Sequence, residues 1–270
     1  MELTTNAVLI ALGLTFIAGM STSIGGLIAF VAKGFNTKFL SASLGLSAGV
    51  MLYISFMELL PDSIHALVGV YSEDMASMVA LLLFFAGVFL IMIIDFFVPD
   101  DKNPHQPILL SDNGARGVKG KAELKRTGVL MALVIGIHNF PEGLAVFAAS
   151  LQDVDLAIPI VVAIAIHNIP EGIAVSVPIY YATGDKKRAF LYSALAGLAE
   201  PIGALVGLLI LLPFWSDAIG AYLYAFIAGI MVYISIDELL PSSEKYGHHH
   251  YAVFGVVVGM AIMGFGLLLF

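Results

Sequence analysis

Eight long apolar stretches dominate this sequence and constrain what the chain can fold into. A transmembrane helix needs about 20 mostly apolar residues. Stretches that meet this requirement cover residues 6–32, 38–61, 75–98, 127–151, 157–181, 188–213, 218–240 and 251–270. Only 12% of the residues are charged, roughly half the share that is usual in a soluble domain. We therefore expect an all-α polytopic membrane protein with eight transmembrane helices.

The basic residues predict how these helices are oriented. All 12 Lys and Arg residues lie on the same side of the eight expected spans, and the loops of the opposite side carry Asp and Glu but no Lys or Arg. Basic residues collect on the cytoplasmic side of membrane proteins, so we expect a multi-pass protein of the plasma (inner) membrane with both termini outside the cytoplasm. The N-terminal stretch lacks a basic start and a small-residue cleavage site, which favours a first span over a signal peptide.

Two segments recur in a way that indicates an inverted repeat. GVMLYISFMELLP (49–61) and GIMVYISIDELLP (229–241) agree at 9 of 13 positions, but their helices are expected to run in opposite directions. A fainter pair precedes them, AGMSTSIGGL (18–27) and AGLAEPIGAL (196–205). Inverted repeats are typical of secondary transporters, whose site lies near the middle of the membrane. We expect a 3+2+3 arrangement: a first repeat (1–98), a flexible cytoplasmic loop (99–126), a central helix pair (127–181) and a second repeat (188–270).

The central helix pair carries a duplicated polar motif. GIHNFPEGLAV (136–146) returns as AIHNIPEGIAV (165–175). In each copy the histidine and the glutamate are four residues apart and share one helix face. The proline removes a backbone donor and clashes with a carbonyl one turn earlier, so we expect it to open the backbone there. The glycine that follows the glutamate is expected to let the two helices of the central pair approach closely.

The depth of these polar groups makes them candidates for a metal site. His138, His167 and Glu200 each lie roughly 15–18 Å inside an expected span, at about 1.5 Å per residue, and ionisable groups at that depth normally face a cavity or a partner. Imidazole and carboxylate ligands suit Zn²⁺, Fe²⁺, Mn²⁺ or Co²⁺. A single His–Glu pair could instead only link helices, but the duplication favours metal. The predicted ligands are His138, Asn139, Glu142, His167, Asn168, Glu171 and Glu200, with room for a second ion shared through the two motif glutamates.

Other side chains are candidates for the route to and from this site. Carboxylates near the outer end of the second span and the inner end of the seventh could admit and release the ion, or could simply reach interfacial water. A cytoplasmic histidine run could receive the ion, although such a run binds metal without needing a role. A methionine in the second span could add a soft ligand or pack in the core. These candidates are Met51, Glu58, Asp237, Glu238, His248, His249 and His250.

With these motifs the chain resembles the ZIP (Zrt/Irt-like) metal transporters, and most closely their bacterial ZupT-type branch. The resemblance rests on the two HNxPEG copies, on GLAE (197–200) and on IDELLP (236–241). It implies a binuclear site in the central helix pair and uptake of divalent cations into the cytoplasm. Zinc is the first expectation, followed by iron, manganese, cobalt and cadmium, all as transported ions and not as cofactors. The implied partners are the lipid bilayer, the metal ions and a second copy in a homodimer, and no nucleic acid.

Two other functions stay open from the sequence. A metal-dependent intramembrane hydrolase could hold zinc on such a helix and activate a water molecule. Catalytic zinc, however, keeps an open position beside three protein ligands, and the duplicated motif singles out neither glutamate as a general base. A sensor would bind the metal without moving it. We expect a transporter and not an enzyme, because hydrolysis has no need of an inverted repeat.

Overall fold

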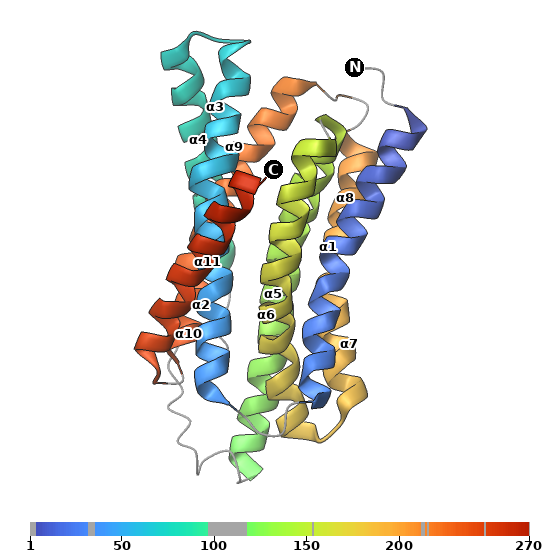
Figure 1. Cartoon of the computed structure of the whole chain (residues 1–270), viewed down its shortest axis with the longest axis vertical. Helices are drawn as coiled ribbons and strands as arrows, with labels where there is room; N and C mark the ends of the chain where they lie inside the picture. Colours follow the sequence, from blue (N-terminus) through green and yellow to red (C-terminus); the bar gives the residue numbers. More distant parts are fainter. Residues whose placement is uncertain are drawn as a thin grey trace.

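The fold is a bundle of long helices. The computed structural model describes residues 4–31, 36–96, 118–152, 154–211, 214, 216–245 and 247–269, and no strand occurs among them. Within these ranges eight helical segments are long and apolar enough to cross a membrane. The first described helix starts and the last one ends in the upper half of the bundle in Figure 1, as an even number of crossings requires. The prediction of an all-α, multi-pass membrane protein is confirmed.

Several of the eight spans are built from more than one helical segment. The second combines α2, η1 and α3, the sixth combines α7 and α8, and the seventh combines α9, η5 and α10. The elements are α1 (Thr5–Val31), α2 (Thr37–Ile54), η1 (Ser55–Leu59), α3 (Leu60–Val68), α4 (Glu73–Phe96), α5 (Val118–Gln152), α6 (Val154–Thr183), α7 (Lys186–Gly197), α8 (Ala199–Leu211), α9 (Asp217–Ile234), η5 (Ser235–Leu239), α10 (Leu240–Glu244) and α11 (His249–Leu269).

The helices form two bundles. One, here called the site bundle, contains α1, α5, α6, α7 and α8; the other, the outer bundle, contains α2, α3, α4, α9, α10 and α11, and lies on the left in Figure 1. They meet mainly where α2 packs on α6 and where α9 packs on α5. Glycines bring helices close within each bundle: a Cβ at Gly25 would lie 2.1 Å from the Ile169 carbonyl oxygen, and one at Gly45 would lie 2.2 Å from that of Ala252. No described glycine makes such a contact between the bundles.

The prediction of a loop over 99–126 is wrong at its C-terminal end, because α5 begins at Val118. The first part of α5 is highly charged, but its buried and exposed residues follow the pattern of a helix with one exposed face. Leu124 and Thr127 are buried, whereas Lys125 and Arg126 are exposed. Because the charged side chains point away from the bundle, a high number of them is compatible with a helix. Residues 99–117, which form the remainder of the expected loop, lie outside the described residues.

The predicted single span over 188–213 is also wrong in detail, because the helix is interrupted at Leu198 and resumes as α8. The interruption comes three residues before Pro201, whose ring disfavours an uninterrupted helix on its N-terminal side. At its other end, α7 begins early, at Lys186, where the Asp185 side chain accepts hydrogen bonds from two backbone N–H groups and caps the helix.

Matching π-helices interrupt the second and seventh spans. They cover Ser55–Leu59 and Ser235–Leu239, which lie at equivalent positions of the repeated segments, and Pro61 and Pro241 follow two residues later. In each, the residue after the π-helix donates its N–H to the carbonyl five residues back, and this wider turn accommodates the proline ring. Both spans therefore continue beyond their predicted ends, as α3 and α10.

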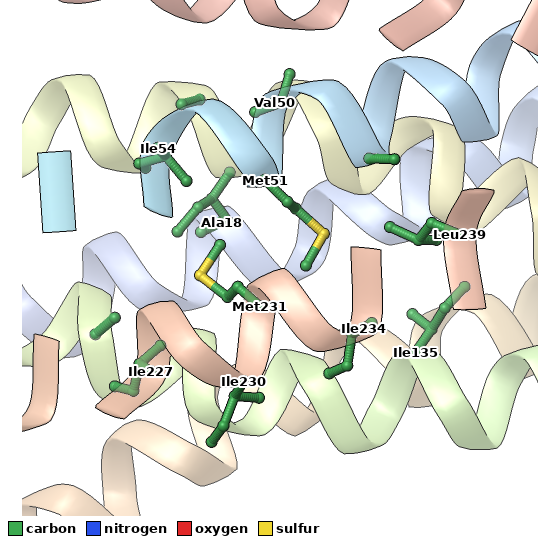
Figure 2. Close-up of a cluster of buried hydrophobic side chains, with 14 of the residues drawn as sticks. Ala18, Val50, Met51, Ile54, Ile135, Ile227, Ile230, Met231, Ile234 and Leu239 are labelled. Carbon is green, nitrogen blue, oxygen red and sulfur yellow. The ribbon is translucent and has the colours of Figure 1, made fainter. Parts of the chain in front are cut away.

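The core between the bundles is apolar and includes Met51, one of the candidate route residues. Met51 of α2 is fully buried in the main hydrophobic cluster with Ala18, Ile54 and Met231. Met231 is its counterpart in the repeated segment, and Figure 2 shows the two methionine side chains pointing toward each other. The position of Met51 agrees with core packing, the second of the two roles expected for it.

Candidate metal centre

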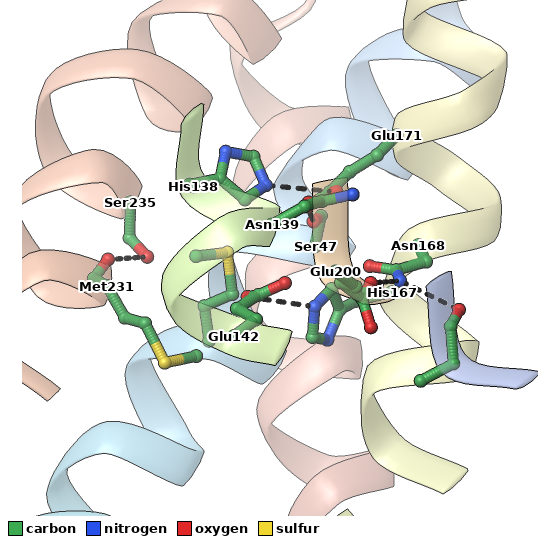
Figure 3. A network of polar contacts seen from close by, with 12 residues as sticks. Ser47, His138, Asn139, Glu142, His167, Asn168, Glu171, Glu200, Met231 and Ser235 are labelled. Atoms are coloured by element: carbon green, nitrogen blue, oxygen red, sulfur yellow. Dashed lines mark hydrogen bonds and ion pairs between the residues drawn. The ribbon is translucent and has the colours of Figure 1, made fainter. Parts of the chain in front are cut away.

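The two HNxPEG copies meet in the site bundle, and each histidine faces the glutamate of the other copy (Figure 3). His138 Nε2 lies 3.1 Å from Glu171 Oε2, and His167 Nε2 lies 3.3 Å from Glu142 Oε1. All four side chains are buried. The crossed pairing follows from the four-residue spacing of histidine and glutamate. Because α5 and α6 are antiparallel, the histidine of each copy lies level with the glutamate of the other copy.

The two asparagines are held in equivalent ways. Asn139 Nδ2 donates to the carbonyl oxygen of Ala196 at 3.3 Å, and Asn168 Nδ2 donates to that of Ala18 at 3.0 Å. Ala18 and Ala196 occupy the same position in the fainter repeated pair of segments. Both amide groups are thus fixed by their nitrogen atoms, and their oxygen atoms accept no hydrogen bond from the described residues.

Glu200 joins the centre from a third helix. The interruption at Leu198 places Glu200 in the first turn of α8, where unpaired backbone N–H groups favour a carboxylate. The side chain is buried and accepts a hydrogen bond from Asn168 Nδ2 through Oε1. The structure therefore brings together all seven predicted ligands, from α5, α6 and α8.

The glycines of the motif act differently from the prediction. A Cβ at Gly143 would lie 2.0 Å from the Glu200 carbonyl oxygen, and a Cβ at Gly172 would lie 1.9 Å from that of Thr22. These glycines bring α8 and α1 against the central pair, so the prediction that they join α5 to α6 is wrong. The close contact at Gly143 is one reason why Glu200 reaches the centre.

The prolines of the motif do not interrupt their helices, contrary to the expected opening of the backbone. Pro141 and Pro170 lie inside the continuous helices α5 and α6. A membrane helix tolerates a proline when neighbouring helices pack around it, and each of these helices is surrounded by several others. In this part of the described chain the interruption is at Leu198 instead.

The centre contains more buried polar atoms than hydrogen-bond partners. Within the described residues, eight such atoms accept or donate no hydrogen bond: His138 Nδ1, His167 Nδ1, His167 Nε2, Asn139 Oδ1, Asn168 Oδ1, Glu142 Oε1, Glu142 Oε2 and Glu200 Oε2. Leaving a buried polar group without a partner costs about 1–3 kcal/mol, so their concentration at one place indicates a ligand. Neutral imidazole, carboxylate and amide oxygen are together the donor set of a divalent transition metal. The side chains present therefore fit a metal ion as cargo.

One contact to the centre was not predicted from the sequence. Ser47 of α2 is fully buried and donates from Oγ to Glu171 Oε1 at 2.7 Å. It is the side chain from the outer bundle that hydrogen-bonds to the predicted ligands in the described structure (Figure 3). The only sequence signal is a polar residue one helical turn before Met51, and small hydroxyl residues are frequent in membrane helices.

The predicted route residues fall into separate groups. Glu58 lies half-buried in η1. Asp237 and Glu238 of η5 approach Asp95 of α4, so that one carboxylate oxygen from each lies within 4.8 Å of the others. Three carboxylates at this spacing could hold a cation. Asp95 is not among the route residues predicted from the sequence, because nothing there relates it to a segment so distant in the chain.

The histidine run lies at the start of α11, close to the basic residues Lys38 and Lys245. His248 Nε2 lies 2.9 Å from Thr37 Oγ1, and His249 Nδ1 lies 2.6 Å from Glu244 Oε1. His250 is exposed. Two of the three side chains therefore have polar contacts within the protein, and a role for them in receiving the ion stays a prediction.

The fold and this centre define a class: a multi-pass membrane protein with a buried cluster of nitrogen and oxygen donors shared by two crossing motifs. The profile of the ZIP zinc transporter family matches residues 100–266. The chain is similar to the zinc transporter ZupT of Streptococcus mutans (53% identity over 257 residues, 95% of this chain and 96% of the relative). It is also similar to those of Clostridium perfringens (50% over 277 residues, 98% and 97%) and Nitratidesulfovibrio vulgaris (52% over 270 residues, 97% and 98%).

The chain belongs to the ZIP zinc transporter family. It is a membrane transporter and not an enzyme, since the relatives that it matches over almost their whole length are named as transporters. The alternative of a metal-dependent intramembrane hydrolase is thereby excluded.

Proposed function

We propose that this protein carries zinc into the cytoplasm and binds it at the centre between α5 and α6. The observation that carries the proposal is the concentration of buried nitrogen and oxygen atoms without hydrogen-bond partners on the two HNxPEG copies. The names of the relatives, which are zinc transporters, support zinc as the ion. His138, Glu142, His167 and Glu171 hold one ion, and Asn139, Asn168 and Glu200 complete the position of a second that the two glutamates share.

The same donors accept other divalent cations, so the proposal includes iron, manganese, cobalt and cadmium as lesser substrates. The test is uptake into proteoliposomes that contain the purified protein and a metal-sensitive dye, with each cation supplied separately. We expect zinc to enter fastest. Zinc that binds to the protein without entering the vesicles would identify a sensor and refute the proposal.

Movement of the site bundle against the outer bundle would give alternating access to the two sides of the membrane. The distribution of glycines supports this proposal: the close helix contacts that lock helices together occur within each bundle and not between the bundles in the described chain. The matching π-helices and the equivalent asparagine contacts support the inverted 3+2+3 repeat on which such a mechanism depends.

The proposed location is the plasma membrane, with both termini outside the cytoplasm. The chain has no cysteine, so single cysteines report the orientation directly. Ser72, in the turn before α4, and Lys187, in the first turn of α7, are both exposed and lie on opposite sides in this topology. We expect an impermeant maleimide to label Ser72→Cys on intact cells and Lys187→Cys only after lysis. The reverse pattern would contradict the orientation.

A homodimer, which the family resemblance implies, is part of the proposal, but the centre does not depend on it. All seven ligands come from a single chain. We therefore expect the protein to bind zinc with the same affinity whether it is a monomer or a dimer in detergent, which size-exclusion chromatography with zinc titration can test.

Asp237 and Glu238 are proposed to receive the ion on its way to the cytoplasm, together with Asp95. Glu238→Gln removes one charge from this group and is expected to lower the kcat of uptake by about tenfold, the scale of losing a supporting ligand contact, with a smaller effect on KM. Glu73→Gln, in an exposed glutamate at the start of α4, serves as the control. Equal kcat values for the two variants would exclude Glu238 from the route.

A further inference from the structure

The centre is nearly symmetric. The crossed His–Glu contacts match each other, and so do the hydrogen bonds of Asn139 to Ala196 and of Asn168 to Ala18. An inverted repeat produces such matching, because it exchanges α5 with α6 and α2 with α9. A difference between equivalent positions is therefore informative, because it shows where the two halves of the centre differ in function.

One such difference lies beside the motif glutamates. Ser47 of α2 donates to Glu171 on α6. The alignment of the repeated segments places Ile227 of α9 at the position equivalent to Ser47, and α9 packs on α5 as α2 packs on α6. Ile227 is buried and has no group that can donate. In the described structure, neither oxygen of Glu142 accepts a hydrogen bond, and its polar contact is the one with His167.

We propose that Ser47 is a positioning residue that fixes the Glu171 carboxylate from the opposite bundle, whereas no hydroxyl in the described structure fixes Glu142, so that the two glutamates that share the ions are held unequally. The inference rests on the proposed function and assigns unequal roles to the two glutamates. With Oε1 held by the Ser47 hydroxyl, Glu171 presents Oε2 on the side that faces His138. A hydroxyl donating to a carboxylate is a strong and directional contact.

The contact also joins the two bundles at the centre. Ser47 belongs to the outer bundle and Glu171 to the site bundle. A second hydrogen bond between the bundles, from Ser242 Oγ to the Met131 sulfur, is long at 3.9 Å, and sulfur is a weak acceptor. The Ser47 bond therefore belongs to one relative position of the bundles, and it stabilises the geometry of Glu171 in that position.

The test compares three variants of the full-length protein. Ser47→Ala removes only the hydroxyl, and Ser47→Thr keeps it. Ser55→Ala removes an equally buried hydroxyl of the same span, which bonds to the Met51 carbonyl in the described part of the chain. We expect Ser47→Ala to raise the KM for zinc uptake and the Kd for zinc in calorimetry by about tenfold, with kcat changed less than KM. Ser47→Thr and Ser55→Ala should stay within about twofold of the wild type, a change of less than about half a kcal/mol.

The results separate this inference from the proposed function. If the wild-type protein binds zinc but does not carry it, transport is refuted, and the Kd values alone decide the role of Ser47. Equal Kd and KM values for Ser47→Ala and Ser55→Ala would overturn the inference while leaving transport intact. A Ser47→Thr protein that melts like the wild type yet binds zinc as poorly as Ser47→Ala would also overturn it, because the hydroxyl would then not be the group that matters.

Discussion

Zinc uptake should fall by at least about 100-fold when Glu171 is replaced by alanine. Losing a residue that merely supports a metal ligand typically lowers affinity by 10–100-fold, and Glu171 is proposed as a ligand itself. The substitution also leaves His138 without the carboxylate that lies 3.1 Å from its ring. His138→Ala should have an effect of the same size. Flux into proteoliposomes loaded with a zinc-sensitive dye measures both.

The control for this prediction is another glutamate on the same protein. Glu73→Ala changes an exposed residue at the start of α4, far from the motif in the chain, and should keep uptake near the wild-type rate. All three variants should elute as monodisperse, helical proteins. Wild-type flux in Glu171→Ala and His138→Ala would show that the ion crosses the protein elsewhere.

Gly172→Ala should destabilise the protein by about 3 kcal/mol or more, at the upper end of what overpacking a core usually costs. The added Cβ would lie 1.9 Å from the Thr22 carbonyl oxygen and 2.8 Å from Ser193 Oγ. The first of these atoms belongs to the backbone of α1, so the contact can be relieved only if α1 and α6 separate. Since α6 carries half of the centre, uptake should be lost together with stability.

Thermal unfolding in detergent measures this effect, with Gly13→Ala as the matched control. Gly13 also lies in a membrane helix, but a Cβ there would meet nothing within 4 Å. We expect the melting temperature of Gly13→Ala to equal that of the wild type and that of Gly172→Ala to fall by several degrees. Equal melting temperatures for the two variants would mean that α1 and α6 are not packed as closely as described.

The spans and the metal centre could be predicted because their signals are local. An apolar stretch of sufficient length is recognisable without its neighbours, and His138 and Glu142 share a helix face whatever surrounds that helix. The duplication of the motif then places a second set at the same depth. Glu200 was found for the same reason, as an isolated charge within an apolar stretch.

The remaining features depend on contacts between distant segments. Ser47 reaches Glu171 only because α2 packs on α6, and Asp95 meets Asp237 only because α4 packs on α9. A glycine in a sequence shows that a close contact is allowed, but not with which helix, so the partners of Gly143 and Gly172 were assigned wrongly. The start of α5 was missed because charged residues on an exposed helix face look like a loop.

X-ray absorption at the zinc edge on the zinc-loaded protein tests the central claim most directly. We expect nitrogen and oxygen ligands at about 2.0–2.2 Å, including imidazole, and loss of the imidazole signal when His138 and His167 are both replaced by alanine. Sulfur in the coordination shell would instead place the ion beside methionine. A spectrum that the double replacement leaves unchanged would contradict the assignment of the HNxPEG motifs as the zinc site.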